Sequence, residues 1–219
     1  MKKRCMILFA IVLAVSLFGC SNNDASVSQP DIVESSSAAS SSTVSEAPES
    51  KAPSEASSSK PEYKSINVTS ETLTADGKWL SVINAKSANP PGSNLSPQIS
   101  WEPVDGAACY AIYMVDNSAR HWLHWLAMNL QVTSLDLGVG EELEGSRYAG
   151  PYPPSGTHEY EVIVYALKTI PEKYPGIFDS NLLSVDKIEE KLDVIDGVPG
   201  NIIAKGSVKG TVTVGEPVE

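Results

Sequence analysis

The last two thirds of the chain consist largely of short stretches of two kinds. In some, apolar residues alternate with polar ones, and in others apolar residues follow one another without a break. Alternation predicts a strand with one buried face, and a short unbroken apolar run predicts a strand that is covered on both faces. The run Cys109–Val115 is therefore predicted to be a central strand. The other predicted strands are Ile66–Leu73, His121–Leu130, His158–Lys168 and Val208–Val214.

One helix is predicted late in the chain. Ser184 is a favourable N-cap, apolar residues repeat at helical spacing from Val185 to Ile195, and a glycine two residues later ends the pattern. The segment Asn201–Ala204 is predicted to be a short second helical turn. Several strands and one late helix predict a mainly β domain of the β-rich α+β class, formed by residues 63–219 and large enough to bury a core.

The start of the chain has the three parts of a secretory signal. Cations at positions 2–4 give a basic start, Met6–Phe18 is an almost unbroken apolar run, and the sequence Leu17-Phe18-Gly19-Cys20 ends it as a lipobox would. The run is shorter than the ~20 apolar residues that a membrane-spanning helix needs. Residues 1–19 are predicted to be a signal peptide, after whose removal Cys20 carries a fatty acyl group such as palmitate. The alternative is an ordinary signal peptide with a chance cysteine.

A Ser-rich stretch follows the predicted lipidation site. Fifteen of the forty residues from Ser21 to Lys60 are Ser, and none is aromatic. Such a segment cannot bury enough apolar area to offset its conformational entropy. Residues 20–62 are therefore predicted to be a disordered tether with a span on the order of 35 Å. The predicted location of the domain is the extracytoplasmic face of a cell membrane.

The charge of the chain narrows the choice of partners. The formal net charge is -11, and removal of the three cations of the signal would make it about -14. An acidic domain is a poor candidate for nucleic acid, whose phosphates require a basic face, and anionic lipid would repel it. Membrane attachment is therefore assigned to Cys20. Cys109 is the one cysteine left in the domain, so no intramolecular disulfide is expected.

Candidate chemistry begins with the three histidines of the chain. Two of them, His121 and His124, lie in one predicted strand. Alternation puts His124 on the same face as Leu126 and Met128, and it puts His121 on the opposite face with Trp125. Only one of these two imidazoles can therefore join the third histidine in a common pocket.

That pocket would also contain a phenol and a carboxylate. His158 and Tyr160 share a face of their strand, and Asp116 directly follows the central strand. If the strands are neighbours, these three side chains and His124 line one pocket. Protonated imidazoles suit a small anion, two His and an Asp suit a metal, and a His-activated water suits hydrolysis; histidines without any ligand are the fourth alternative. No HxH or HExxH spacing is present, and no metal is predicted.

Three segments in a fixed order resemble a known protein family. Asn94–Trp101 fits the pattern NxSPxxxW, His124-Trp125 fits an HW pair, and Tyr148–Tyr160 fits YxGPxPPxGxHxY. Together they resemble the phosphatidylethanolamine-binding proteins, in the bacterial Raf kinase inhibitor-like branch. The resemblance implies a large antiparallel sheet, a smaller second sheet and a C-terminal helical element. It also implies a small pocket for phosphate, phosphoryl headgroups or carboxylates.

The same resemblance implies which residues form the pocket. Asp116 corresponds to the first acid of the family's DPDxP segment, which is reduced here to Asp116–Arg120, and this reduction reshapes one wall. Tyr152 stands where bacterial members often carry Cys. The residues that correspond to the family's pocket are Asp116, Trp122, His124, Gly150, Pro151, Pro153, Pro154, His158 and Tyr160.

The leading functional hypothesis is a lipid-anchored binding protein that takes a small anion, needs no cofactor, and inhibits or scaffolds a partner protein. One alternative is a His-assisted phosphoester hydrolase, for which no nucleophile or metal signature is present. Another is a protease inhibitor that acts through a surface loop, either Asn117–Arg120 or Glu172–Ser180. Anion binding is expected to tighten as the pH falls toward ~6, because His124 and His158 gain charge there.

Overall fold

The computed structural model describes residues 61–219, and its main feature is a six-stranded sheet. The strand order is β1-β9-β8-β4-β5-β7. Neighbouring strands are antiparallel except for β1 and β9, which pair in parallel, so the sheet is mixed only at one edge. In sheet order the strands span Lys64–Ser65, Ile202–Thr213, Thr157–Leu167, Cys109–Asp116, Trp122–Leu130 and Arg147–Tyr148.

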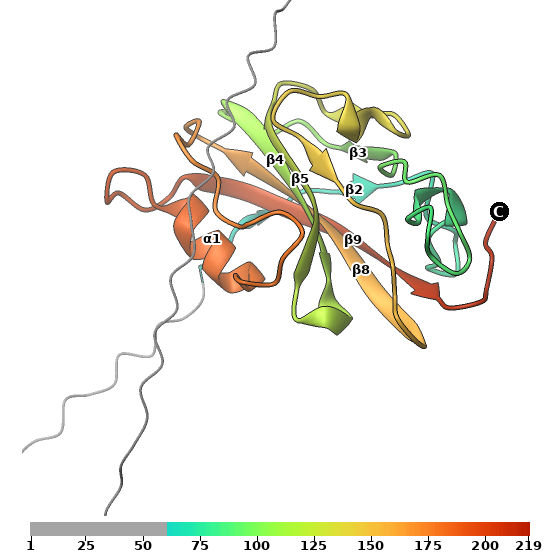
Figure 1. Ribbon diagram of the computed structural model, residues 1–219. Helices are drawn as coiled ribbons and strands as arrows, with labels where there is room; N and C mark the ends of the chain where they lie inside the picture. Colours follow the sequence, from blue (N-terminus) through green and yellow to red (C-terminus); the bar gives the residue numbers. More distant parts are fainter. Residues whose placement is uncertain (1–60) are drawn as a thin grey trace, which may run out of the picture. The chain divides into compact units, whose positions relative to one another are not determined.

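A smaller antiparallel sheet and one α-helix lie on opposite sides of the large sheet (Figure 1). The small sheet has the order β2-β3-β6, with strands Val68–Thr69, Ile99–Trp101 and Ser134–Leu135. The helix α1 spans Val185–Asp193. Three 3-10 helices complete the described elements: η1 (Ser81–Ile83), η2 (Asn117–Ala119) and η3 (Val139–Glu141).

Each face of the large sheet is covered by its own apolar core. Ile112 and Met114 pack between the two sheets, whereas Tyr113 and Val115 pack in the core beneath α1. All eight residues of β4 are buried, and this confirms the prediction of a central strand covered on both faces. The mainly β class and the predicted set of two sheets and a late helix are also confirmed.

The predicted helix begins where expected and ends earlier. The Ser184 hydroxyl accepts a hydrogen bond from the Lys187 backbone N–H at 3.4 Å, as an N-cap does. The helix ends at Asp193, and the carboxylate of this residue accepts the backbone N–H of Ile202 at 2.8 Å. This bond ties the end of α1 to the start of β9.

Two predictions of secondary structure, one of a helical turn and one of a strand, are wrong at least in part. The segment Asn201–Ala204 is not a helical turn, because Ile202 begins the twelve-residue strand β9, which also contains the predicted strand Val208–Val214 except for its last residue. The segment Ile66–Leu73 is not one strand. The chain changes sheets there, since β1 pairs with β9 in the large sheet and β2 pairs with β3 in the small one.

The predicted alternation along β5 fails at two positions, one at His124 and one between Ala127 and Leu130. Leu123 and Leu126 both pack beneath α1, whereas Trp125 packs between the sheets. Strict alternation does not allow this arrangement, and the pairing with β4 shows the reason: β5 contains one extra residue between Leu123 and Trp125. This β-bulge at His124 leaves its imidazole on the side of Tyr160, and the two ring centroids are 5.2 Å apart.

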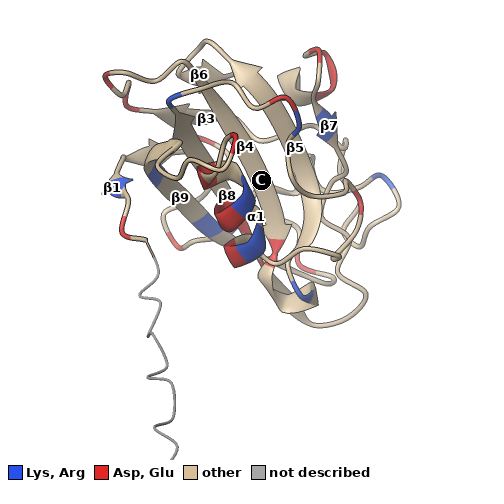
Figure 2. Ribbon diagram, turned by 90° about the vertical axis from the view of Figure 1, so that its left-hand side faces the viewer, with Lys and Arg blue, Asp and Glu red and all other residues tan. Residues whose placement is uncertain are grey.

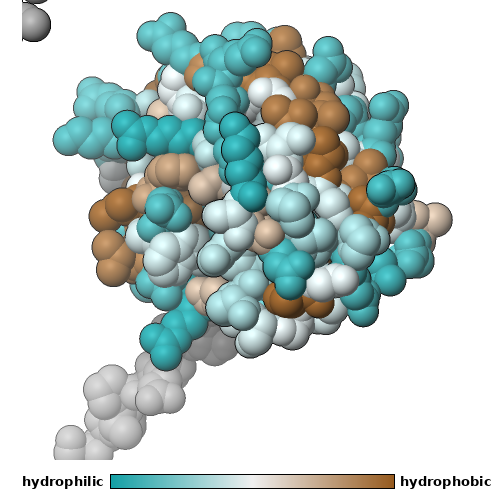
Figure 3. Space-filling model, turned by 45° about the vertical axis from the view of Figure 1, so that its right-hand side comes forward, coloured by the Kyte–Doolittle hydropathy of each residue, from teal (hydrophilic) through white to brown (hydrophobic). Residues whose placement is uncertain are grey.

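Several predictions concern residues that the structure does not describe. The signal peptide 1–19, the lipidated Cys20 and nearly all of the linker 20–62 lie outside residues 61–219, and the domain boundary at 63 stays a prediction. Within the described residues, no helix has the length and apolar character needed to cross a membrane. Leu182 and Val198 are the most exposed large apolar side chains. On the face seen in Figure 3, hydrophobic patches are interrupted by hydrophilic residues.

Candidate functional site

A cavity of about 440 Å³ opens at one end of the large sheet. It lies where the end of β4, the start of β5 and the start of β8 meet the loop that follows β7. Small residues, among them Ala85 and Gly150, form part of its wall. Its polar and aromatic lining residues are Asn94, Asp116, Trp122, His124, Tyr152, His158 and Asp179.

The buried Asp116 and the partly buried His158 form a pair in this cavity. Oδ2 of Asp116 lies 2.6 Å from Nδ1 of His158, which donates the hydrogen because the carboxylate accepts. Oδ1 of Asp116 accepts the backbone N–H groups of Ser118 and Ala119, at 2.8 and 3.1 Å, and thereby caps η2. With Nδ1 engaged, Nε2 is the ring nitrogen of His158 that is left for a ligand.

His124 is held by the loop after β7. Its Nδ1 lies 2.9 Å from the carbonyl oxygen of Ala149, which can only accept, so Nδ1 carries the hydrogen. Burial lowers the pKa of His124 below its usual value, and this effect outweighs the opposing influence of the Ala149 carbonyl and the Asp116 carboxylate. The imidazole is therefore neutral near pH 7, with an unprotonated Nε2.

Tyr160 lies beneath both histidines. Its ring makes an edge contact with His124 and stacks on His158, whose centroid is 6.4 Å away. The hydroxyl oxygen is fully buried close to the Asp116 side chain and the Tyr152 backbone, but it makes no hydrogen bond of good geometry with a described residue. Burial, and next the negative charge of the nearby Asp116, raises the pKa of Tyr160 well above its usual value, so the phenol stays neutral.

One wall of the cavity comes from the loop between β8 and α1. The indole N–H of Trp122 donates to Oδ1 of Asp179 at 3.0 Å. The backbone of this loop pairs with Leu123, since the Asp179 N–H donates to the Leu123 carbonyl at 3.0 Å and the Leu123 N–H donates to the Ser180 carbonyl at 2.9 Å. The carboxylate of Asp179 is thereby placed at the mouth of the cavity.

The rim loop requires glycine at position 150. A Cβ atom there would lie 2.4 Å from the Ile83 carbonyl oxygen and 2.5 Å from the Ala85 nitrogen. The Gly150 N–H donates to Oδ1 of Asn94 at 2.8 Å, and the Ala85 N–H donates to the Pro151 carbonyl at 3.0 Å. These contacts hold the loop after β7 against the segment that follows η1.

The cavity brings together most, though not all, of the predicted site residues. Asp116, Trp122, His124, Gly150, Pro154 and His158 line it. Pro151 and Pro153 are buried behind the rim, and Tyr160 is buried beneath the histidines. His121 lies elsewhere, in a groove with Glu159 and Lys209. The roles of these residues in binding stay predictions.

Sequence reasoning missed Asn94 and Asp179 as parts of the site. Asn94 opens the NxSPxxxW segment, and its place in that motif was a usable signal. Asp179 had no comparable signal, because it reaches Trp122 from a loop 57 positions later in the chain. Among residues 61–219, no group of three or more His, Cys, Asp or Glu side chains is placed to hold a metal ion.

Comparison with known proteins assigns the family. The sequence profile described as "Phosphatidylethanolamine-binding protein" matches residues 69–213, which is more than half of the chain. The chain belongs to the phosphatidylethanolamine-binding protein family. The family prediction is thus confirmed, whereas the Raf kinase inhibitor-like branch and the lipid anchor stay predictions.

This family member is similar to proteins from distant organisms. A UPF0098 protein of Methanothermobacter thermautotrophicus is 28% identical over an alignment of 137 residues, and the match covers 54% of this chain and 83% of the relative. A putative odorant-binding protein A5 of Drosophila melanogaster is 31% identical over an alignment of 96 residues, and the match covers 39% of this chain and only 43% of the fly protein.

A solved structure shows the same fold. The crystal structure of Escherichia coli YbcL, titled a new member of the mammalian PEBP family, matches with a TM-score of 0.53 and 24% identity. The match covers 68% of this chain and 98% of YbcL. The chain therefore shares the fold of YbcL over the matched part.

Proposed function

We propose that this protein binds a small anion, either phosphate, a phosphoryl headgroup or a carboxylate, in the cavity between His124 and His158. The observation that carries the proposal is the engagement of both imidazoles through Nδ1, by Ala149 and by Asp116. Each ring has Nε2 left, and both rings line the same cavity. Two imidazole N–H groups that converge on one space suit an oxyanion.

The proposed binding requires a proton. No Lys or Arg is among the described residues that line the cavity, and Asp116 contributes a negative charge. An anion in this site therefore needs protonation of an imidazole, and neutral His124 would take up a proton when the anion enters. Binding should tighten as the pH falls, because acid lowers the cost of that protonation.

The proposed location is the extracytoplasmic face of a membrane, with the domain held through a lipid on Cys20. The support is the lipobox-like end of the apolar N-terminal run and the Ser-rich stretch after it. In this setting the protein inhibits or scaffolds a partner outside the cytoplasm. Cys20→Ala should move the protein from the membrane fraction to the soluble fraction, and retention in the membrane fraction would contradict the lipid anchor.

Calorimetric titration with inorganic phosphate from pH 5.5 to 8 tests the pocket. The double variant His124→Gln/His158→Gln should bind phosphate at least about tenfold more weakly than the unaltered protein at pH 6, because it loses two charge-assisted donors. His121→Gln is the matched control, since His121 lies in a different groove. Equal affinity of the double variant and the control would refute the assignment.

The Asp116–His158 pair also supports a test of the hydrolase alternative. A carboxylate that orients an imidazole is the arrangement of a general base. No Ser, Thr or Cys side chain lines the cavity among the described residues, so the nucleophile would be water. Turnover of a phosphomonoester panel that disappears in His158→Gln and persists in His121→Gln would favour catalysis over binding alone.

A further inference from the structure

The charges around the cavity are unusual for an anion site. Two carboxylates, Asp116 and Asp179, line it, and the only groups of the lining that can become cationic are the two imidazoles. The phenols of Tyr152 at the rim and Tyr160 beneath complete the titratable groups. Even with both histidines protonated, the lining carries no net positive charge.

Asp116 and Asp179 differ in what surrounds them. Asp116 is buried, and three donors engage it. Asp179 is exposed, and the indole of Trp122 donates to only one of its oxygens. Burial lowers the pKa of His124, and the carboxylate of Asp179 acts on it in the opposite direction, so Asp179 is close enough to influence charge inside the cavity.

The backbone holds Asp179 at this position. The two hydrogen bonds between Leu123 and the residues Asp179 and Ser180 fix the loop to the start of β5. Together with the indole N–H of Trp122, these bonds keep the Asp179 carboxylate beside the cavity. A second negative charge on a ligand would meet this fixed carboxylate without any cation of the lining to balance it.

We propose that the cavity selects singly charged anions, such as phosphodiesters and carboxylates, over doubly charged phosphomonoesters, and that Asp179 is the residue that sets this selectivity. The inference rests on the proposed function, because it assumes that the cavity binds anions. The inference adds to the proposed function a preference for singly charged ligands and a role for Asp179. Asp179 acts by electrostatic repulsion of a second negative charge on the ligand, at the mouth of the cavity, and not by direct contact with the bound ligand.

Calorimetry with three small ligands tests the inference. Dimethyl phosphate and acetate carry one charge at pH 7.5, whereas methyl phosphate, with a second pKa near 6, carries two. The unaltered protein should bind both singly charged ligands about three- to tenfold more tightly than methyl phosphate. At pH 5, where methyl phosphate is singly charged, its disadvantage relative to dimethyl phosphate should largely disappear.

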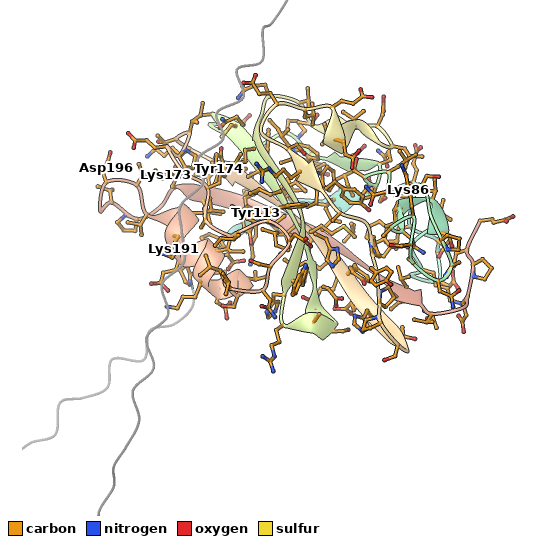
Figure 4. The ribbon with its side chains drawn as sticks, in the orientation of Figure 1. Lys86, Tyr113, Lys173, Tyr174, Lys191 and Asp196 are labelled. Atoms are coloured by element: carbon orange, nitrogen blue, oxygen red, sulfur yellow. The ribbon has the colours of Figure 1, made fainter. Side chains whose placement is uncertain are left out.

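Asp179→Asn removes the charge and keeps an oxygen that can accept from Trp122. This variant should reduce the preference for dimethyl phosphate over methyl phosphate at pH 7.5 to about twofold or less. Asp196→Asn is the control with the same change in net charge. Figure 4 places Asp196 at the opposite end of the domain from Lys86, the neighbour of the cavity residue Ala85, and this variant should keep the original preference.

The outcomes separate the two proposals. Two outcomes would overturn the role of Asp179 and leave the anion site intact. One is binding of all three ligands with methyl phosphate preferred at pH 7.5, and the other is a preference that stays unchanged in Asp179→Asn. Absence of binding by all three ligands at both pH values would overturn the proposed function and this inference with it. A preference for single charge that Asp179→Asn removes and Asp196→Asn keeps would establish the inference.

Discussion

Two charged hollows of this domain, the groove that contains His121 and the cavity that contains His158, differ in how their charges are balanced. The larger one, a groove of about 940 Å³ lined by parts of β1, β8, β9 and α1, contains Lys–Glu pairs. Lys209 lies 3.2 Å from Glu161, and Lys205 lies 2.6 Å from Glu189. Figure 2 shows the basic residues of β9 beside the charged helix α1. The smaller cavity pairs its buried carboxylate with an imidazole instead.

This difference decides which hollow responds to a ligand near neutral pH. Partial burial opposes the charge on Lys209, yet Glu161 and Glu159 still hold its pKa above the usual value. Lys209 therefore keeps its charge over the physiological range, although the groove also contains His121. The charge of the cavity depends on imidazoles that gain or lose a proton near neutral pH, so an anion can change it. Size alone would have pointed to the groove.

The largest expected effect concerns the buried carboxylate of the cavity. Asp116→Ala should reduce the free energy of unfolding by about 3 kcal/mol, because it leaves His158 and two backbone N–H groups of η2 without their acceptor. Urea denaturation at pH 7 measures this loss. Asp105→Ala, at an exposed position, should change stability by less than about 0.5 kcal/mol. A similar small change for both variants would show that the Asp116 contacts contribute little.

The next effect is the acid sensitivity that His124 gives the folded state. The pKa of His124 is lowered in the folded protein, whereas an unfolded histidine titrates near ~6.5. As the pH falls through this value, the unfolded chain takes up a proton that folded His124 does not, so stability decreases. Without anions, His124→Gln should lose stability less steeply than the unaltered protein from pH 6.5 to 5. His121→Gln should keep the original slope, and identical slopes for both variants would contradict the burial argument.

A smaller effect is expected beneath the cavity. Tyr160→Phe removes a buried hydroxyl that lies beside Asp116 without a hydrogen bond of good geometry, so stability should change by less than about 1 kcal/mol. Phosphate affinity should change by less than about twofold, since Tyr160 does not line the cavity. Thermal denaturation and calorimetry measure the two quantities. A large loss of affinity would mean that the hydroxyl reaches the ligand in the bound state.

The smallest effect is expected in the groove. The Lys209 side chain is half exposed, and its ion pairs with Glu159 and Glu161 are screened by solvent. Lys209→Gln should therefore lower stability by less than about 1 kcal/mol and leave phosphate binding unchanged. If this substitution weakened phosphate binding as strongly as loss of the cavity histidines, the distinction between the two hollows would fail.

Much of the cavity was predictable because strand order and alternation carry local information. Asp116 follows the apolar run of β4, and His158 lies near the start of the strand that pairs with it, so their meeting at one end of the sheet follows from pairing. The Gly/Pro-rich rim loop was visible in the sequence, as were the N-cap at Ser184 and the central strand.

The rest depended on features that periodicity does not contain. The β-bulge at His124 breaks the alternation of β5, and it arises from pairing with β4 rather than from a residue pattern. The position of Asp179 depends on hydrogen bonds between a late loop and Leu123. The chain also changes sheets between β1 and β2, a step that an alternating segment does not reveal.

Proton uptake on binding tests the central claim most directly. Dimethyl phosphate does not titrate between pH 6 and 7.5, so calorimetry at pH 7 in two buffers of different ionisation enthalpy counts the protons that the protein itself takes up. We expect uptake of a substantial fraction of one proton in the unaltered protein and in His121→Gln, and its loss in His124→Gln. Binding of dimethyl phosphate without proton uptake, or with uptake that survives His124→Gln, would contradict an anion site that depends on protonation of His124.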